Sequence, residues 1–182
     1  MRHKPHRTDR LVRNHGWRAQ PGYKIVVLDR GAVRFEVPDP WVVEPAQDCV
    51  KAFDKQPPDD ECVLAVSHHR WSRAGESLSP ATLVRSALAS DPRSLVEVTP
   101  IAEETRIDTT LAWAQGSFVD VRIDRKALAR LCIARRGELQ ALVTFDFWAT
   151  DLERCGAQWT AILASLQLGQ WVADPARGPM LS

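Results

Sequence analysis

The chain has 182 residues, of which 45% are hydrophobic and 26% are charged, and its formal net charge is +1. This balance is typical of one globular domain and excludes a wholly disordered or collagen-like chain. No apolar run is long enough for a membrane-spanning helix, and no apolar core of a secretory signal follows the charged start. We therefore expect a soluble, cytoplasmic protein.

Residues 1–22 form a basic arm in front of the predicted domain. Residues 1–18 hold six lysines and arginines against one aspartate, without apolar periodicity. A segment with nothing to bury is predicted to be disordered. A short basic arm is an unspecific signal for nucleic acid, so nucleic acid is not the expected partner.

The domain is predicted to cover residues 23–168 and to open with a β-hairpin. Residues 24–29 are rich in β-forming side chains, Arg30-Gly31 supplies a tight turn, and residues 32–37 alternate apolar and polar. The segment Pro38-Asp39-Pro40 stops the second strand. We expect it to turn Trp41 back to cap one end of the core.

The next elements are two strands and a helix. Residues 48–55 and 61–69 are predicted strands, because the prolines and aspartates between them favour a turn. Ser79 and Pro80 have the residue types of an N-cap and a first helical position. The helix ends at Asp91-Pro92, and its apolar stripe is Leu83, Val84, Ala87 and Leu88.

Residues 95–148 have an apolar period close to two, which predicts an antiparallel meander. Residues 105–115 and 119–123 are each predicted to be a strand, and residues 128–135 and 138–148 form the last hairpin through Arg136-Gly137. The apolar face of the first two strands is predicted to hold Ile107, Leu111, Trp113, Val119, Val121 and Ile123. The opposite, polar face is predicted to hold Arg106, Asp108, Asp120, Arg122, Arg130, Gln140 and Asp146.

A C-terminal amphipathic helix follows. Thr150 and Glu153 have the spacing of a capping box, and Gly169 is expected to cap the other end. Its stripe is Leu152, Cys155, Trp159, Ile162, Leu163 and Leu166, which we expect to lie across the apolar face of the sheet. In the tail, residues 169–182, Trp171 is either a staple over the core, the preferred interpretation, or an anchor for a partner.

The four cysteines have no C-x-x-C spacing and no cluster with histidine, which argues against structural zinc. Cys132 and Cys155 lie among apolar residues and are predicted to be buried thiols. A bridge between Cys49 and Cys62 would require an oxidising compartment. We expect no metal and no cofactor.

Two groups of residues are candidates for a partner-binding site. The first is His68, His69, Arg70 and Trp71, at a strand end beside a polar loop. Adjacent histidines on a strand point to opposite faces, so they are not expected to bind one metal together. The second group comes from the polar face, which is otherwise an ordinary solvated face: Arg106, Asp108, Arg122 and Gln140.

Two motifs resemble those of the PsbP-like superfamily. They are F-x-V-P-x-x-W, here Phe35–Trp41, and W-x-x-I-L-x-S-L, here Trp159–Leu166. The superfamily includes a photosystem II extrinsic protein, a Ran-binding import factor, DcrB-type lipoproteins and chaperones of type VI secretion effectors. The resemblance implies an α+β fold, an α/β/α sandwich with a central antiparallel sheet, and a protein that binds another protein without catalysis.

The sequence thus predicts a non-enzymatic protein-binding module. Such a module would act as a chaperone or loading adaptor for a secreted or membrane-destined partner, and a homodimer is a further option. The alternative is a small hydrolase or ligand-binding domain with its site near His68, His69 and Trp71. No nucleophile or nucleotide motif supports the alternative.

Overall fold

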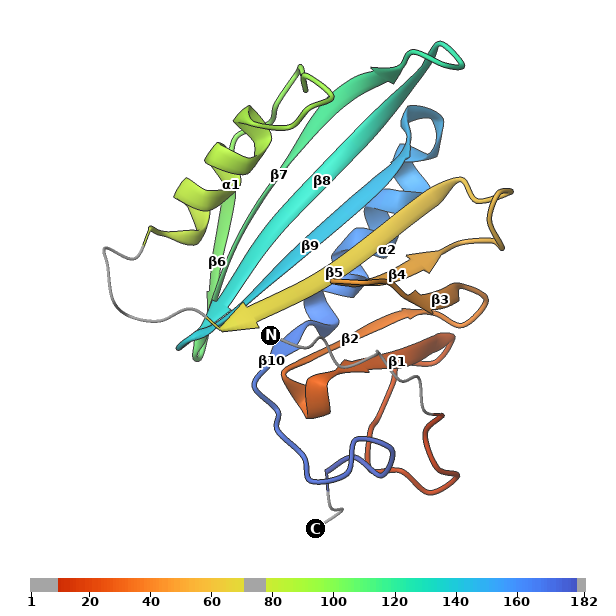
Figure 1. Cartoon of the computed structure of the whole chain (residues 1–182), viewed down its shortest axis with the longest axis vertical. Coiled ribbons are helices and arrows are strands. Elements are labelled where there is room, and N and C mark those ends of the chain that lie inside the picture. Colours follow the sequence, from red (N-terminus) through yellow and green to blue (C-terminus); the bar gives the residue numbers. More distant parts are fainter. Residues whose placement is uncertain (1–9, 71–77, 180–182) are drawn as a thin grey trace.

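The computed structural model describes residues 10–70 and 78–179, and within them the chain forms two antiparallel sheets and two α-helices (Figure 1). The smaller sheet has the order β1-β2-β10 and the larger one β3-β4-β5-β9-β8-β7-β6. The strands are β1 Tyr23–Leu28, β2 Val33–Pro38, β3 Val42–Pro45, β4 Val50–Phe53, β5 Cys62–Arg70, β6 Ala102–Arg106, β7 Thr109–Asp120, β8 Arg125–Arg136, β9 Leu139–Trp148 and β10 Gln167–Leu168. The helices are α1 Pro80–Ala89 and α2 Leu152–Ser165, with 3-10 turns η1 Asp29–Gly31 and η2 Ala149–Asp151. The predicted α+β class, with its central antiparallel sheet and closing helix, is confirmed.

The opening hairpin is confirmed as well. β1 pairs with β2 from Tyr23 opposite Pro38 to Leu28 opposite Val33. Gly31 closes the turn at a φ of 93°, and a Cβ there would meet the backbone of Gln170. The turn therefore requires glycine both for its conformation and for the close passage of the tail.

One face of the large sheet packs against α2, as expected. Alternate residues of β9 from Leu139 to Phe147 are buried on this face. The Trp159 ring of α2 stacks on Phe145 with centroids 6.2 Å apart, and Trp113 meets it edge-on at 6.0 Å. Trp41 lies 5.8 Å from Phe145, so it caps this core as predicted.

The other face packs against α1. Ser79 is the N-cap and its hydroxyl accepts a hydrogen bond from the Thr82 amide, as its position predicted. Ten helical residues span about 15 Å, whereas the twelve residues of β7 span about 40 Å. The described part of α1 therefore covers only a portion of this face, around the following buried side chains: Ala112, Ala114 and Ile133.

The bounds of two predicted strands of the meander were wrong, although Leu111 and Trp113 lie in β7 and face the core as expected. Ile107 does not lie in a strand but in the two-residue turn between β6 and β7, where its exposed fraction is 106%. β7 ends at Asp120, so Val121 and Ile123 belong to the turn before β8. Both are exposed, as is Val119. β-branched residues continue the period-two pattern through both turns, which is why the pattern did not show where the strands end.

The capping box of the last helix was also wrong. Asp151 occupies the N-cap position, without a side-chain cap, after the turn η2. Thr150 instead accepts a hydrogen bond from Arg125 at 3.1 Å. At the other end, the helix stops at Ser165 and Gly169 comes after β10, so it is not the C-cap. The buried stripe is confirmed except for Leu152, which is exposed.

The described part of the arm, residues 10–22, packs against the tail, which corrects the expectation of disorder there. Trp17 is buried, and its Nε1 donates to the Pro175 carbonyl at 2.9 Å. The amide of Val12 donates to the Ala176 carbonyl at 3.0 Å. Residues 1–9 lie outside the described residues. Trp17 of the arm is the buried tryptophan that holds the tail in place. Trp171 is 48% exposed, so the preferred interpretation of it as a staple over the core was wrong.

A buried ion pair connects the small sheet to α2. The guanidinium of Arg34 contacts the carboxylate of Glu36, and both side chains are buried. Ser165 accepts from Arg34 through its carbonyl at 3.2 Å and from the Glu36 amide through its hydroxyl at 2.9 Å. Two buried charges are stable only with such partners. Because Arg34 and Glu36 are buried as well as the apolar residues of β2, both faces of this strand are covered.

Substitution Trp159→Ala should destabilise the chain by about 3–5 kcal/mol, because it empties the centre of the aromatic core. Trp171→Ala, at a half-exposed tryptophan, should cost less than about 1 kcal/mol. Urea unfolding with a common slope measures both. Equal losses for the two variants would contradict this description of the core.

Candidate functional site

The first predicted group of binding residues is divided between two faces of the sheet. His68 lies opposite Ala141 and its Nε2 is 3.7 Å from Asp29, whereas His69 lies opposite Gln140 on the other face. The predicted opposite orientation of the two rings is thus confirmed. The guanidinium of Arg70 lies over the Trp171 ring at 4.7 Å, and Trp71 falls outside the described residues.

The second group does not share one surface either. Arg106 donates to the Leu163 carbonyl at 2.8 Å, on the side of α2, and Asp108 pairs with Arg136. Gln140 accepts a hydrogen bond from Arg135 at 2.6 Å on the opposite face. Arg122 pairs with Asp120 at 3.4 Å at the far turn of the β7–β8 hairpin.

The single polar face was therefore wrong. Arg130 is one example of the error: it lies on the α2 side, over the rings of Phe147 and Trp159 at 5.3 and 6.0 Å. The prediction assigned faces by continuous alternation, and the turns at Ile107 and after Asp120 interrupt this alternation. That the candidate residues bind a partner stays a prediction.

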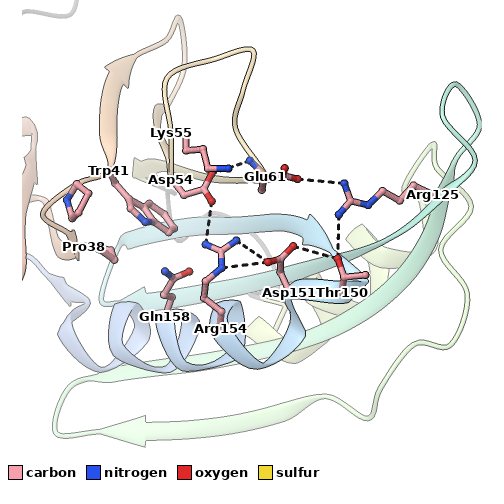
Figure 2. Close-up of a pocket in the computed structure, with 11 residues that line it drawn as sticks. Pro38, Trp41, Asp54, Lys55, Glu61, Arg125, Thr150, Asp151, Arg154 and Gln158 are labelled. Atoms are coloured by element: carbon pink, nitrogen blue, oxygen red, sulfur yellow. Dashed lines mark hydrogen bonds and ion pairs between the residues drawn. The ribbon is translucent and has the colours of Figure 1, made fainter.

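A charged pocket of about 660 Å³ lies between the end of the opening hairpin and the start of α2 (Figure 2). Figure 2 shows Arg154 between two carboxylates, Asp54 at 3.0 Å and Asp151 at 3.1 Å. Arg125 pairs with Glu61 at 3.3 Å on the opposite wall. Each of these carboxylates is compensated within the pocket, so the three do not present a free charge to a ligand.

Two buried cysteines, at the start of β5 and in α2, lie next to each other. A hydrogen bond between the thiols of Cys62 and Cys155 raises the pKa of Cys62 far above its usual range and lowers the pKa of Cys155. Cys62 thus neighbours Cys155 and not Cys49, contrary to the bridge that was considered, and the cysteines are free thiols. Burial raises the pKa of Cys132 to about 12, so this thiol is unreactive.

A second pocket, of about 590 Å³, lies where α1 leaves the sheet uncovered. Its walls are largely apolar: Val63, Pro92, Phe118, Val121, Ala127 and Trp148. Arg93, in the loop after α1, lies over the Phe118 ring at 4.5 Å. This pocket combines an apolar lining with a few polar groups, as small-molecule and peptide sites do.

The polar centre of the second pocket is Asp146. Its Oδ2 accepts a hydrogen bond from Arg93 at 2.8 Å. Its Oδ1 is buried and has no hydrogen-bond partner among the described residues. Burial raises the pKa of Asp146 from its ordinary value of 3.8, although Arg93 opposes the shift. The carboxylate therefore retains one acceptor that faces no donor.

Exposed apolar side chains lie at the end of the β7–β8 hairpin, and two of them, Val119 and Val121, also line this pocket. They are Val119, Val121 and Ile123, with exposed fractions of 51%, 89% and 58%. We refer to these three residues as the hairpin-end patch. From their period-two pattern these three residues were expected to lie in the core. The one sequence signal of the patch is the cluster of β-branched residues among polar turn residues.

Across residues 10–70 and 78–179, no three His, Cys, Asp or Glu side chains come together as metal ligands would. Neither helix of the described chain is long and apolar enough to cross a membrane.

The chain matches a family model described as Alr1449 over residues 24–172. It is also 36% identical to the uncharacterized protein alr1449 of Nostoc sp. over 170 residues, which cover 92% of this chain and 88% of the relative. Both matches extend through the sheet and α2.

Solved structures with low sequence identity share the fold. Cyanobacterial PsbP (CyanoP) of Synechocystis sp. has a TM-score of 0.63 at 10% identity, over 83% of this chain and 95% of CyanoP. LpqN of Mycobacterium tuberculosis has a TM-score of 0.58 at 12% identity, over 80% and 90%. The Ran-binding protein Mog1p of Saccharomyces cerevisiae has a TM-score of 0.55 at 10% identity, over 80% and 95%. The resemblance to the PsbP-like superfamily is thereby confirmed at the level of the fold.

Asp146→Asn should change how stability depends on pH. Because the folded-state pKa of Asp146 is raised, the folded state binds more protons than the unfolded state above pH 3.8, and stability falls as pH rises through this window. The free energy of unfolding of the wild type relative to Asp146→Asn should therefore decrease as pH rises from about 3.8 towards neutral.

Asp91→Asn is the matched control with the opposite sign. Hydrogen bonds from Arg93 lower the pKa of Asp91, so its contribution is present above pH 3.8 and is lost as pH falls through the folded-state pKa. Urea unfolding between pH 3 and 7 measures both differences. Parallel pH profiles for the two variants would refute the assignment.

Proposed function

This chain belongs to the Alr1449 family and has a PsbP/Mog1-like fold, and from that premise we propose that it is a non-enzymatic protein-binding module whose partner docks on the hairpin-end patch. The observation that carries the proposal is the exposure of Val119, Val121 and Ile123 together at the end of one hairpin. Contiguous exposed apolar side chains with a polar rim mark interaction sites in soluble proteins. Folds of this kind typically serve as binding modules.

The charges around the patch support a protein interface. Asp120 pairs with Arg122 at 3.4 Å, and Lys126 pairs with Glu97 at 2.5 Å. These pairs leave an apolar centre surrounded by charged groups of both signs. Interfaces that form and dissociate have this arrangement, with an apolar core and a polar rim.

The shape of the hairpin also suits docking. β7 and β8 pair along their whole length, from Thr110 opposite Arg135 to Asp120 opposite Arg125. The patch is therefore held at the end of a regular two-stranded ladder within the large sheet (Figure 1). Little conformational entropy is lost when a partner binds to such a preordered surface.

In the finer form of the proposal, the module is a cytoplasmic chaperone or loading adaptor for a secreted or membrane-destined protein. An apolar patch of this kind would cover an apolar segment of the cargo before delivery. Arg70 and the half-exposed Trp171 form a second contact surface, because their stacked side chains lie outside the core. Arg and Trp are the residue types enriched in interface hot spots.

The environments of the two histidines support a non-catalytic role. His68 faces the Asp29 carboxylate and His69 faces the Gln140 amide, on opposite sides of the sheet. The two rings therefore do not share one site. The hydrolase alternative depended on a joint site at these residues.

Val121→Asp should strongly reduce retention of the partner by the full chain, because it places a charge at the centre of the patch. Ile107→Asp is the matched control, since Ile107 is equally a turn residue and is fully exposed, but lies in the β6–β7 turn. Affinity capture from an extract of the source cells, with quantitative mass spectrometry, should show a protein retained by wild type and Ile107→Asp and reduced about tenfold with Val121→Asp.

Thermal unfolding should show both aspartate variants folded, because both positions are exposed. Equal retention by Val121→Asp and wild type would contradict the docking surface. Turnover of a substrate in a broad hydrolase panel, with no protein retained, would favour the enzymatic alternative.

A further inference from the structure

The second pocket gives the chemistry of the segment that would bind at the hairpin end, an inference that rests on the proposed docking surface. The pocket opens on the α1 face beyond the reach of α1. Val63 lies opposite Asp146 and Ala127 lies opposite Trp148, so these four side chains share that face. Pro92 and Arg93 close the side nearest α1.

The pocket has room and apolar surface for a side chain of a partner. Its volume of about 590 Å³ lies within the range of small-ligand sites. The rings of Phe118 and Trp148 line the pocket, and a guanidinium lies over one face of each ring, that of Arg93 at 4.5 Å and that of Arg125 at 4.4 Å. Val119 and Val121 belong both to the lining of the pocket and to the hairpin-end patch. A segment that docks on the patch therefore also reaches the pocket.

Asp146, in the lining of this pocket, has one hydrogen-bond acceptor without a donor in the described part of the chain. Asp146 uses Oδ2 for Arg93, while Oδ1 is buried without a donor among the described residues. An unsatisfied buried acceptor is unfavourable, and a donor supplied by a ligand removes the penalty. Arg93 does not supply a second bond, since it is also bound to Asp91 at 2.8 Å.

The charge of the lining selects a cationic donor. Four carboxylates line the pocket, those of Asp60, Glu61, Asp120 and Asp146, against the guanidinium groups of Arg93 and Arg122. Both arginines are already paired with carboxylates. Glu61 is also paired, with Arg125 at 3.3 Å, but four carboxylates against two guanidinium groups leave the lining net negative. This lining would repel an acidic ligand and attract an ammonium or guanidinium group.

We propose that this pocket binds a protein segment in which an apolar side chain is adjacent to a lysine or arginine. The apolar side chain packs between Phe118 and Trp148, and the cation donates a hydrogen bond to Oδ1 of Asp146. Charge-assisted hydrogen bonds of this type are stronger than neutral ones. Asp146 thereby distinguishes basic from acidic apolar segments.

The test is a titration of the ¹⁵N-labelled full chain with three acetylated, amidated hexapeptides that differ at one position. Their sequences are Ala-Leu-Val-Lys-Leu-Ala and its Gln and Glu versions. The Lys peptide should bind about tenfold more tightly than the Glu peptide. The largest amide shifts should fall on Val63, Phe118 and Trp148.

Asp146→Asn should reduce the preference for Lys over Gln to about one, because it removes the charge and keeps the shape. Asp120→Asn, which alters a carboxylate of the same lining that is paired with Arg122, should keep most of the preference. The inference is overturned if Lys and Glu peptides bind equally, if none of the peptides binds, if the preference survives in Asp146→Asn, or if the shifts lie elsewhere. A cellular partner that is lost on Val121→Asp, together with any of these results, would leave the docking surface intact and reject only the cation site.

Discussion

The packing of α2 on the large sheet is the contact on which the rest of the structure depends. Trp159 stacks on Phe145, and Trp41 and Trp113 close around this pair from the hairpin and from β7. The apolar stripe of α2 thereby covers this face of the sheet. Among the described residues, the opposite face is covered by α1, which is much shorter than the strands that it crosses, and by the loop after it, through Leu95 and Ile101. The uncovered end of that face is where the second pocket and the hairpin-end patch lie.

The two pockets differ in how their charges are satisfied. In the charged pocket near Trp41, Arg154 lies between Asp54 and Asp151, so its ion pairs are complete without a ligand. In the second pocket, Asp146 is desolvated and one of its oxygens has no donor among the described residues. A binding site is better indicated by an incomplete polar group in an apolar setting than by a larger volume. The smaller pocket is for that reason the stronger candidate.

Local patterns predicted most elements, and contacts between distant segments explain what they missed. The alternation in β9 and the Ser79-Pro80 pair are local signals, and both were correct. Val121 was assigned to the core because β-branched residues in a turn have the same pattern as a strand. The hydrogen-bond donor of Asp146 is Arg93, which is 53 residues away in sequence, so no local pattern could predict the site. Likewise, the order around Trp17 depends on a carbonyl of the C-terminal tail.

Hydrogen–deuterium exchange of the full chain, with and without its isolated partner, tests the central claim most directly. If the partner docks at the hairpin end, backbone amides at residues 118–127, and those at residues 60–63 on the pocket wall, should exchange more slowly in the complex. Amides of β3 and of the β6–β7 turn should be unchanged. Protection confined to β3, to the β6–β7 turn or to the tail around Trp171, with unchanged exchange at residues 118–127, would contradict the account.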